Sequence, residues 1–159
     1  KRIDKNLNLT KNLSKVSLTI GPGSYTGLRV GASFISALHI SKNIPFYPFT
    51  IKDILDFNST NYNKKNIGIF VISSNNQNFF CKFNEIGEVD YSKIEENKFN
   101  IPKHIDTIFY NYKKFKTNNN FKQIKFSFVD EIIKNYDMIK FRKKETIKPI
   151  FISNNNILN

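Results

Sequence analysis

The chain has 159 residues, and 25 lysine and arginine residues against 13 acidic residues give it a formal net charge of +12. This length can bury most of the apolar surface of one domain, and no Pro/Gly/Ser-rich linker divides the chain. Cys81 is its one cysteine, which excludes an intramolecular disulfide and a multi-cysteine zinc site. No apolar run approaches the roughly 18 to 20 residues that cross a bilayer, so we expect one cytoplasmic domain, residues 1–159.

The first predicted elements are a strand and a helix. Apolar alternation at Val16, Leu18 and Ile20 predicts a strand with one buried face. The glycines that follow allow the chain to turn, and residues 26–40 predict a helix. Because residue 1 is lysine and the first strand follows only a short polar helical stretch, residues 3–7, we expect a further segment upstream.

Further strands and helices are predicted downstream. Thr50, followed three residues later by Asp53, is a capping arrangement that predicts a helix start. The polar residues 74–77 between two β-rich runs predict a hairpin. The predicted elements are an extended segment at 46–49, a helix at 51–57, strands at 67–73, 78–84, 107–112 and 124–128, and a helix at 129–138.

The turn between the first strand and the helix is dense in small residues. A glycine turn that feeds a helix N-terminus can hold an anion, because free backbone N–H groups and the positive end of the helix dipole point at one spot. The other interpretation is a tight connection without a ligand, since neither the P-loop spacing nor Gly-x-Gly-x-x-Gly is present. Ser24 or Thr26 is expected to cap the helix. The turn consists of Gly21, Pro22, Gly23, Ser24, Tyr25 and Thr26.

A longer motif contains this turn. Residues 21–31 read Gly-Pro-Gly-Ser-Tyr-Thr-Gly-Leu-Arg-Val-Gly, and a helix of small residues and then Asn43-Ile44-Pro45 follow. This pattern resembles the signature of the TsaB family, also called YeaZ. Residues 147–152, in which a proline precedes an aromatic-containing strand, resemble the closing segment of that family. The length of the first motif carries the resemblance, which covers residues 13–50.

The resemblance implies an α/β chain with the actin-like ATPase, ribonuclease H-like fold, lacking its N-terminal strands. It divides the chain into a first lobe near residues 1–57 and a reduced second lobe near 58–159. It also implies a role in making N6-threonylcarbamoyladenosine in tRNA. In that pathway TsaB is a non-catalytic accessory subunit that binds and activates the catalytic subunit TsaD, and TsaE supplies an ATPase in the larger complex.

The chain departs from the family pattern in two places. Ser73-Ser74-Asn75 stands where many relatives have Asp-Ala-Arg, and Ser153 follows the closing strand where relatives often have arginine. These losses weaken the expectation of a ligand contact in the second lobe.

The predicted helix after the turn has two different sides. The side expected to lie on the sheet carries Gly27, Val30, Gly31, Phe34, Ile35 and Leu38. The side chains on the opposite side are small apart from that of Arg29, and their spacing alone predicts an ordinary solvent-exposed face. TsaB-like proteins pair with TsaD, or with themselves as a homodimer, through this helix and the preceding one, so the resemblance implies a docking face anchored by Arg29. The predicted interface residues are Gly27, Arg29, Ala32, Ser33 and Ser36.

Catalytic chemistry is not indicated by the side chains. His39 and His104 each lack a second histidine or carboxylate at ligand spacing. Ser24 does not match the nucleophile elbow, because Pro22 and Thr26 occupy the two positions that require glycine. The sequence therefore predicts no catalytic residue, metal or cofactor, and favours the accessory subunit.

Two other functions stay open. A phosphate- or nucleotide-binding enzyme would use the turn from Gly21 to Gly27 as a ligand cradle. A basic tRNA-binding module would use the net charge, although Lys, Asn, Ile, Phe and Tyr all have AT-rich codons and composition alone can generate such a charge. The densest basic cluster surrounds Phe141 and is more often a solvated face than a nucleic-acid site. It comprises Lys140, Arg142, Lys143 and Lys144.

Overall fold

The computed structural model describes residues 12–72, 77–95, 99–116, 120–141, 148, 150–153 and 156–158. The first elements are β1 (Val16–Thr19), α3 (Tyr25–Lys42), β2 (Phe46–Phe49) and α4 (Ile51–Asn58). The next are β3 (Ile67–Ile72), β4 (Asn78–Phe83), β5 (Val89–Ile94), β6 (Thr107–Tyr110), β7 (Lys122–Lys125), α5 (Phe128–Lys134) and the 3-10 helix η1 (Tyr136–Met138). The last are β8 (Phe151–Ser153) and β9 (Asn156–Leu158), which pair as a hairpin.

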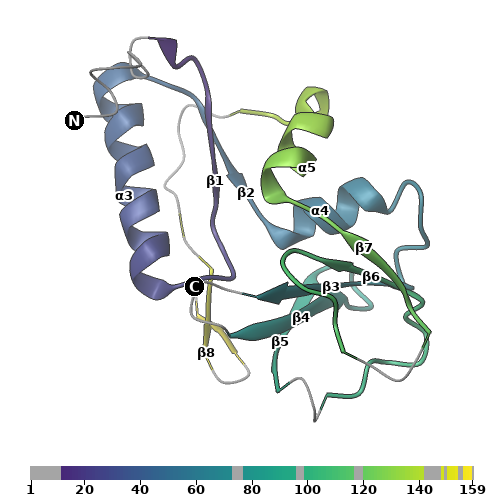
Figure 1. Ribbon diagram of the computed structural model, residues 1–159. Coiled ribbons are helices and arrows are strands. Elements are labelled where there is room, and N and C mark those ends of the chain that lie inside the picture. Colours follow the sequence, from purple (N-terminus) through teal and green to yellow (C-terminus); the bar gives the residue numbers. More distant parts are fainter. Residues whose placement is uncertain are drawn as a thin grey trace.

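β1 and β2 form a two-stranded parallel sheet that α3 connects, with Val16 opposite Phe46. On one face of this sheet, Phe46 packs with Ile35 and Leu38 of α3. On the other face, the ring of Tyr47 lies 6.1 Å from that of Phe141, which follows η1. The sheet therefore lies between α3 and the α5–η1 segment (Figure 1).

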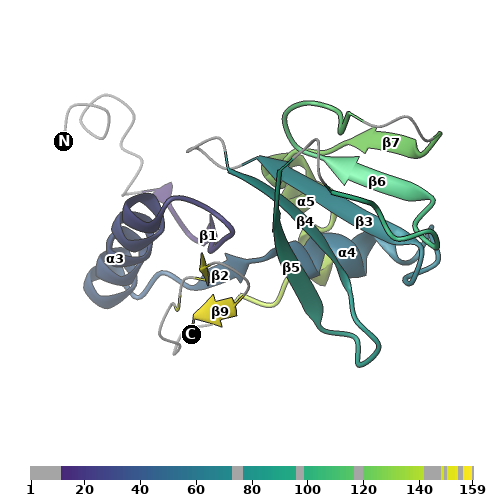
Figure 2. The same cartoon turned by 90° about the horizontal axis from the view of Figure 1, so that it is seen from below.

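The larger sheet has five strands in the order β5-β4-β3-β6-β7. β4 pairs antiparallel with both β3 and β5, while β6 pairs parallel with both β3 and β7. The continuous apolar sequence of β3, Ile-Gly-Ile-Phe-Val-Ile, is typical of a strand buried on both faces. Its first five residues are indeed buried, and Figure 2 shows α4 and α5 on one side of the sheet.

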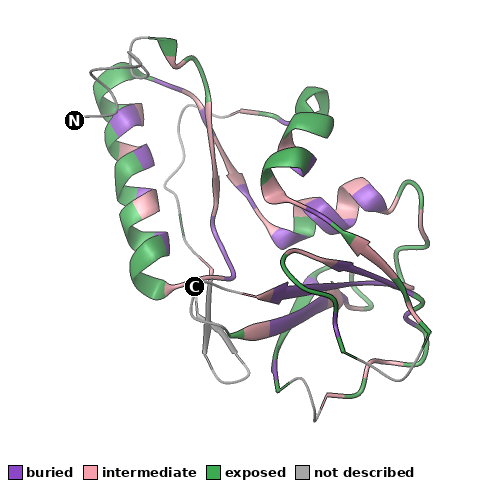
Figure 3. Ribbon diagram, viewed as in Figure 1, coloured by how far each residue is buried: buried purple, intermediate pink, exposed green. Residues whose placement is uncertain are grey.

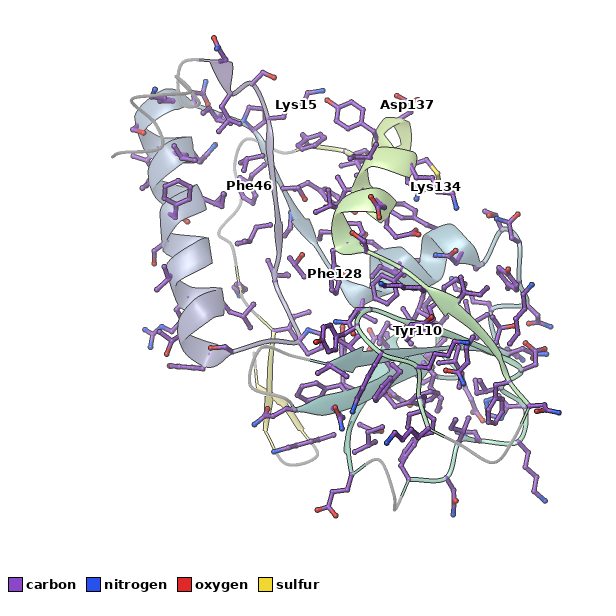
Figure 4. All side chains as sticks on the ribbon, viewed as in Figure 1. Lys15, Phe46, Tyr110, Phe128, Lys134 and Asp137 are labelled. Carbon is purple, nitrogen blue, oxygen red and sulfur yellow. The ribbon has the colours of Figure 1, made fainter. Side chains whose placement is uncertain are left out.

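Two apolar clusters cover the faces of the five-stranded sheet. On the helix side, Ile54 and Leu55 of α4 and Phe128 of α5 pack on Ile69 and Phe109. On the other side, loop residues take the place of helices. That second cluster consists of Phe70, Phe80, Ile94, Ile105, Ile108 and Phe115, with Ile72, Phe99, Ile101, Tyr110 and Phe121 packed against it. Figure 4 shows Phe46 and Phe128 pointing into the interior from their elements.

The predicted start of α4 is confirmed in detail. Thr50 Oγ1 accepts a hydrogen bond from the Asp53 backbone N–H at 3.2 Å, and Asp53 Oδ2 accepts one from the Thr50 backbone N–H at 2.7 Å. The hydroxyl of Tyr47 also donates to Asp53. Since β2 leads directly into α4 through Thr50, this capping box fixes the junction between the two sheets.

Most predicted elements are confirmed, with corrections late in the chain. The predicted strand 124–128 is wrong at its end, because Ser127 caps α5 and Phe128 is the first residue of that helix. The predicted helix 129–138 ends at Lys134 and continues as η1. β5 was not predicted. Residues 3–7, 73–76 and 142–147, on which several sequence predictions rest, lie outside the described residues.

Candidate functional site

The start of the glycine turn is held by backbone contacts from two segments, which bond to Ile20 just before Gly21. The backbone N–H of Ile20 donates to Phe49 O at 3.0 Å, and the N–H of Ile150 donates to Ile20 O at 2.7 Å. Gly21 has φ +138°, and a Cβ there would lie 2.6 Å from Ile150 O. Only glycine combines this backbone conformation with so close an approach of another chain segment. The Gly21–Pro22 peptide bond is cis.

The end of the turn starts α3. Ser24 is the N-cap, and its hydroxyl accepts a hydrogen bond from the Gly27 backbone N–H at 3.3 Å. This confirms Ser24 as the capping residue, while Thr26 lies within the helix and is exposed. At the other end, Asn43 adopts the left-handed conformation and its N–H donates to His39 O, which closes the helix.

The predicted orientation of α3 is confirmed for Ile35 and Leu38, which are buried on the sheet side, and is wrong for three other residues. Ala32, expected on the docking face, is only 7% exposed and packs against the β1–β2 sheet, whereas Val30 and Phe34, expected on the sheet, are 64% and 59% exposed. Gly31 faces β1 as expected, since a Cβ there would lie 3.1 Å from Leu18 Cδ1. Figure 3 shows the buried side of α3 turned toward the sheet and the exposed side turned away.

The other predicted interface residues lie at different places around the helix. Gly27, Arg29 and Ser33 are exposed, and Ser36 is half-buried. The guanidinium of Arg29 donates from Nη1 to the Tyr25 hydroxyl at 2.6 Å and lies 5.1 Å from the Tyr25 ring centroid. Arg29 is thus laid along its own helix, one turn from Tyr25. Whether these residues contact a partner stays a prediction.

The exposed side of α3 also carries apolar side chains that the helical projection had assigned to the core. Val30 and Phe34 share it with Ala37 and with Ile40, which is 83% exposed. On a helix, residues three and four apart are neighbours, so these side chains form a continuous apolar stripe. We call this stripe, Val30, Phe34, Ala37 and Ile40, the outer face of α3.

A cleft of about 300 Å³ lies between the glycine turn and the end of β3. Its lining carries no ionisable side chain among the described residues: Thr19, Pro22, Gly23, Ser24, Gly27, Leu28, Val71, Ile72, Asn111 and Phe128. Asn111 is already engaged, since its Oδ1 accepts from Ile72 N and its Nδ2 donates to Ile72 O, both at 3.0 Å. The described lining of the cleft is therefore uncharged, and it offers a phosphate group no cationic side chain.

The remaining candidate residues have structural surroundings. His39 Nδ1 lies 3.0 Å from Ile44 O, and its ring packs edge-on against Phe46. Burial raises the pKa of the Cys81 thiol far above its usual value, so Cys81 stays protonated in the core. No three His, Cys, Asp or Glu side chains gather into a metal-binding group in the part of the chain that the structure describes. No described helix is both long and apolar enough to span a bilayer.

Comparison with known families adds an independent observation. The family model "TsaD: tRNA N6-adenosine threonylcarbamoyltransferase" matches residues 1–150. The chain belongs to this family. TsaD and TsaB share the actin-like ATPase fold, so the match confirms both the α/β fold class and the predicted relationship to the machinery of tRNA threonylcarbamoyladenosine modification.

One solved structure agrees with the TsaD-family fold at a TM-score above 0.5. This structure, described as an uncharacterized protein with similarity to peptidase YEAZ from Pseudomonas aeruginosa, has a TM-score of 0.54 at 10% identity and covers 96% of this chain and 80% of its own. YeaZ from Pseudomonas aeruginosa has a TM-score of 0.38 at 12% identity and covers 69% of this chain and 55% of its own. No curated protein sequence matches the chain. The resemblance to TsaB is confirmed at the level of this family and fold.

Proposed function

We propose that the chain is a non-catalytic accessory subunit that binds and activates a TsaD-like catalytic subunit through α3, with a TsaE-like ATPase in the larger complex. The observation that carries the proposal is the outer face of α3. Val30, Phe34 and Ile40 are each more than half exposed on one side of an 18-residue helix. Exposed apolar side chains that adjoin one another mark surfaces used for protein contact.

Packing of α3 on its own sheet supports this role. Four residues spaced around the inner side, Leu28, Ala32, Ile35 and Leu38, are buried, so the helix is already fixed before any partner arrives. A rigid helix that presents apolar side chains loses little conformational entropy on binding. The polar residues beside the stripe, Arg29 and Ser33, are placed to form its rim.

The geometry supports a phosphate-binding function less well than it supports the accessory role. The glycine turn does lead into a helix N-terminus, as an anion site requires. However, the Gly27 N–H already donates to Ser24, and the described lining of the adjoining cleft is uncharged. A family member that activates a partner by contact needs no charged lining in this cleft.

The test is co-expression with the TsaD-like protein of the same genome. Val30→Arg and Phe34→Arg place a charge in the middle of the proposed contact, so we expect each to weaken the complex about tenfold or more, measured by isothermal titration calorimetry. Ile86→Arg is the matched control, because Ile86 is also 80% exposed but lies in the β4–β5 turn. Ala32→Arg is unsuitable, since it would disrupt the packing of α3 on the sheet.

Activation gives a second readout. The complex should transfer the threonylcarbamoyl group to tRNA faster than the TsaD-like protein alone, and the Val30→Arg variant should lose that increase. Binding to the TsaD-like protein that survives both α3 variants would contradict the proposed face. A purified chain that forms only homodimers, or that carries out the transfer by itself, would contradict the accessory role.

A further inference from the structure

Residues 111–116, which follow β6, carry exposed basic and aromatic side chains that the proposed contact on α3 does not use. We call this segment the lysine loop. We propose that the lysine loop, together with Lys125 of β7, binds single-stranded RNA. This binding surface goes beyond the accessory function and does not depend on the contact through α3.

Positive charge is concentrated in this part of the chain. Residues 107–129 include five lysines and no aspartate or glutamate. Lys113, Lys114 and Lys116 are exposed in the lysine loop, and Lys125 is exposed on β7. Among the described residues, neither Lys114 nor Lys125 forms an ion pair. The charge of these two side chains is therefore available to an anionic partner.

Strand register places Lys125 on the same face of the sheet as the lysine loop. β6 and β7 are parallel, with Ile108 opposite Gln123 and Tyr110 opposite Lys125. Opposed residues share a face, and Tyr110 lies on the face that Phe115 covers. α5 covers the other face, where Phe128 packs against the cluster that contains Phe109, and Figure 4 shows Lys134 on this helix.

The lysine loop is held at two residues, Asn111 and Phe115. At its start, the Asn111 amide exchanges two hydrogen bonds with the backbone of Ile72. Near its end, Gln123 Oε1 accepts from Phe115 N at 2.9 Å, and Gln123 Nε2 donates to Phe115 O at 3.1 Å. The Phe115 ring is buried, 5.0 Å from that of Phe70. A fixed loop loses little conformational entropy when it binds.

Tyr112 is the part of the surface that distinguishes RNA from other anions. It is 76% exposed on this fixed backbone, between Asn111 and the first lysine. An exposed ring beside lysines provides a stacking platform for a base while the ammonium groups contact the phosphates. Lysine ammonium groups are point charges without a planar donor fork, so the surface is suited to the RNA backbone and to unpaired bases of any sequence.

The experiment uses fluorescence anisotropy with a labelled oligouridylate of about 15 nucleotides, the length that one such surface can cover. Tyr112→Ala should lower the affinity about fivefold or more, whereas Tyr112→Phe keeps the ring and should retain it. Lys114→Glu with Lys125→Glu should weaken binding further. The pair should also reduce the slope of log K against log salt by about 0.7 for each phosphate that the variant no longer binds.

Lys134→Glu is the matched charge control, because Lys134 is exposed on α5, across the sheet from the lysine loop. It should change the affinity far less than Lys114→Glu or Lys125→Glu. Circular dichroism melting verifies that each variant is folded. Val30→Arg should leave RNA binding unchanged, and the lysine variants should leave binding to the TsaD-like protein unchanged, so the two proposals fail separately.

Three results would overturn the RNA surface. Equal reductions in affinity for Lys134→Glu and the lysine-loop variants would show a general effect of net charge. Unchanged affinity in Tyr112→Ala would remove the stacking role. Binding through the same lysines to phosphatidylserine vesicles, with no binding to the oligouridylate at about 50 mM salt, would identify a membrane surface instead.

Discussion

The two parallel-strand regions of the molecule are buried to very different depths. In β3, at the centre of the five-stranded sheet, five of six residues are buried. In β1, whose apolar side chains alternate with polar ones, every residue is only half-buried. Helices cover one face of the larger sheet and apolar loops cover the other, whereas α3 is the main cover of β1.

This difference indicates that the two regions have different roles. The five-stranded sheet has a complete core and can act as the rigid body of the molecule. The β1–α3–β2 region keeps apolar surface on both β1 and the outer face of α3, so it has more to gain from a partner. β2 joins the regions, since Phe46 packs in the smaller cluster and Phe49 in the larger.

Truncation of one side chain in each region is expected to have the largest effect. Ile69→Ala removes a fully buried side chain from the centre of β3 and should cost about 2 to 5 kcal/mol of unfolding free energy. Leu18→Ala in β1 should cost clearly less, because Leu18 is half-buried and the space left can admit water. Urea denaturation followed by circular dichroism gives both values, and equal reductions in stability would refute the difference in core quality.

Glycine-to-alanine substitutions test the same difference in packing between the two regions, because each substitution adds one methyl group. A Cβ at Gly68 in β3 would lie 2.4 Å from Phe80 Cζ, a ring fixed in the core, so Gly68→Ala should cost about 1 to 3 kcal/mol. A Cβ at Gly31 in α3 would meet the end of the Leu18 side chain at 3.1 Å, which can rotate away. The helix propensity gained there is about 1 kcal/mol, so Gly31→Ala should be neutral or stabilising. A strongly destabilised Gly31→Ala variant would mean that β1 is as tightly packed as β3.

The helix caps of the two regions should differ by a smaller amount. Thr50 takes part in a reciprocal capping box with Asp53, whereas Ser24 accepts one bond of 3.3 Å at an exposed helix start. We expect Thr50→Ala to cost about 1 to 2 kcal/mol and Ser24→Ala about 0.5 kcal/mol. Thermal denaturation of the two variants in parallel measures the difference. The reverse order would show that the glycine turn depends on its cap more than α4 does.

Local signals in the sequence predicted much of this fold. The apolar run of β3, the alternation of β1 and the Thr50–Asp53 pair each act within a few residues, so the pattern is sufficient to place the element. β5 has a different sequence, Val-Asp-Tyr-Ser-Lys-Ile, and only its first and last residues are buried. It is a strand because β4 pairs with it along its length, which no local pattern reveals.

The candidate sites show where sequence reasoning ends. The position of α3 was predictable, but the full set of apolar side chains that it buries was not, since this depends on how the helix meets β1. The lysine loop depends on Asn111 and Gln123, whose partners lie 39 and 8 residues away. Amide side chains of this kind are usually exposed, so only the assembled sheet shows that these two organise a surface.

The smallest expected effect concerns a charge network beside the five-stranded sheet. Asp56 accepts from Lys52 Nζ at 2.5 Å and from Lys64 Nζ at 2.7 Å. Burial raises the pKa of the Asp56 carboxyl, but the hydrogen bonds and charges of the two lysines outweigh burial and hold that pKa below its usual value. Because the pKa is lower in the folded state, the stabilisation is complete above about pH 5 and is lost as the pH falls through the folded pKa.

Asp56→Asn should therefore lower the unfolding free energy at neutral pH by about 1 kcal/mol or less, since the side chain is partly exposed and screened by solvent. Its stability should also fall less than that of the wild type between pH 5 and pH 3. Asp137→Asn on η1 is the matched control, as Asp137 forms no ion pair among the described residues.

All described ion pairs lie in or beside the five-stranded sheet. Acid should therefore reduce the amount by which the local stability of this sheet exceeds that of the β1–β2 region. Hydrogen exchange of the backbone amides in the two sheets at pH 7 and pH 4, corrected for intrinsic rates, measures the free energy of local opening of each sheet. If the difference in opening free energy between the sheets is the same at both pH values, packing alone accounts for it.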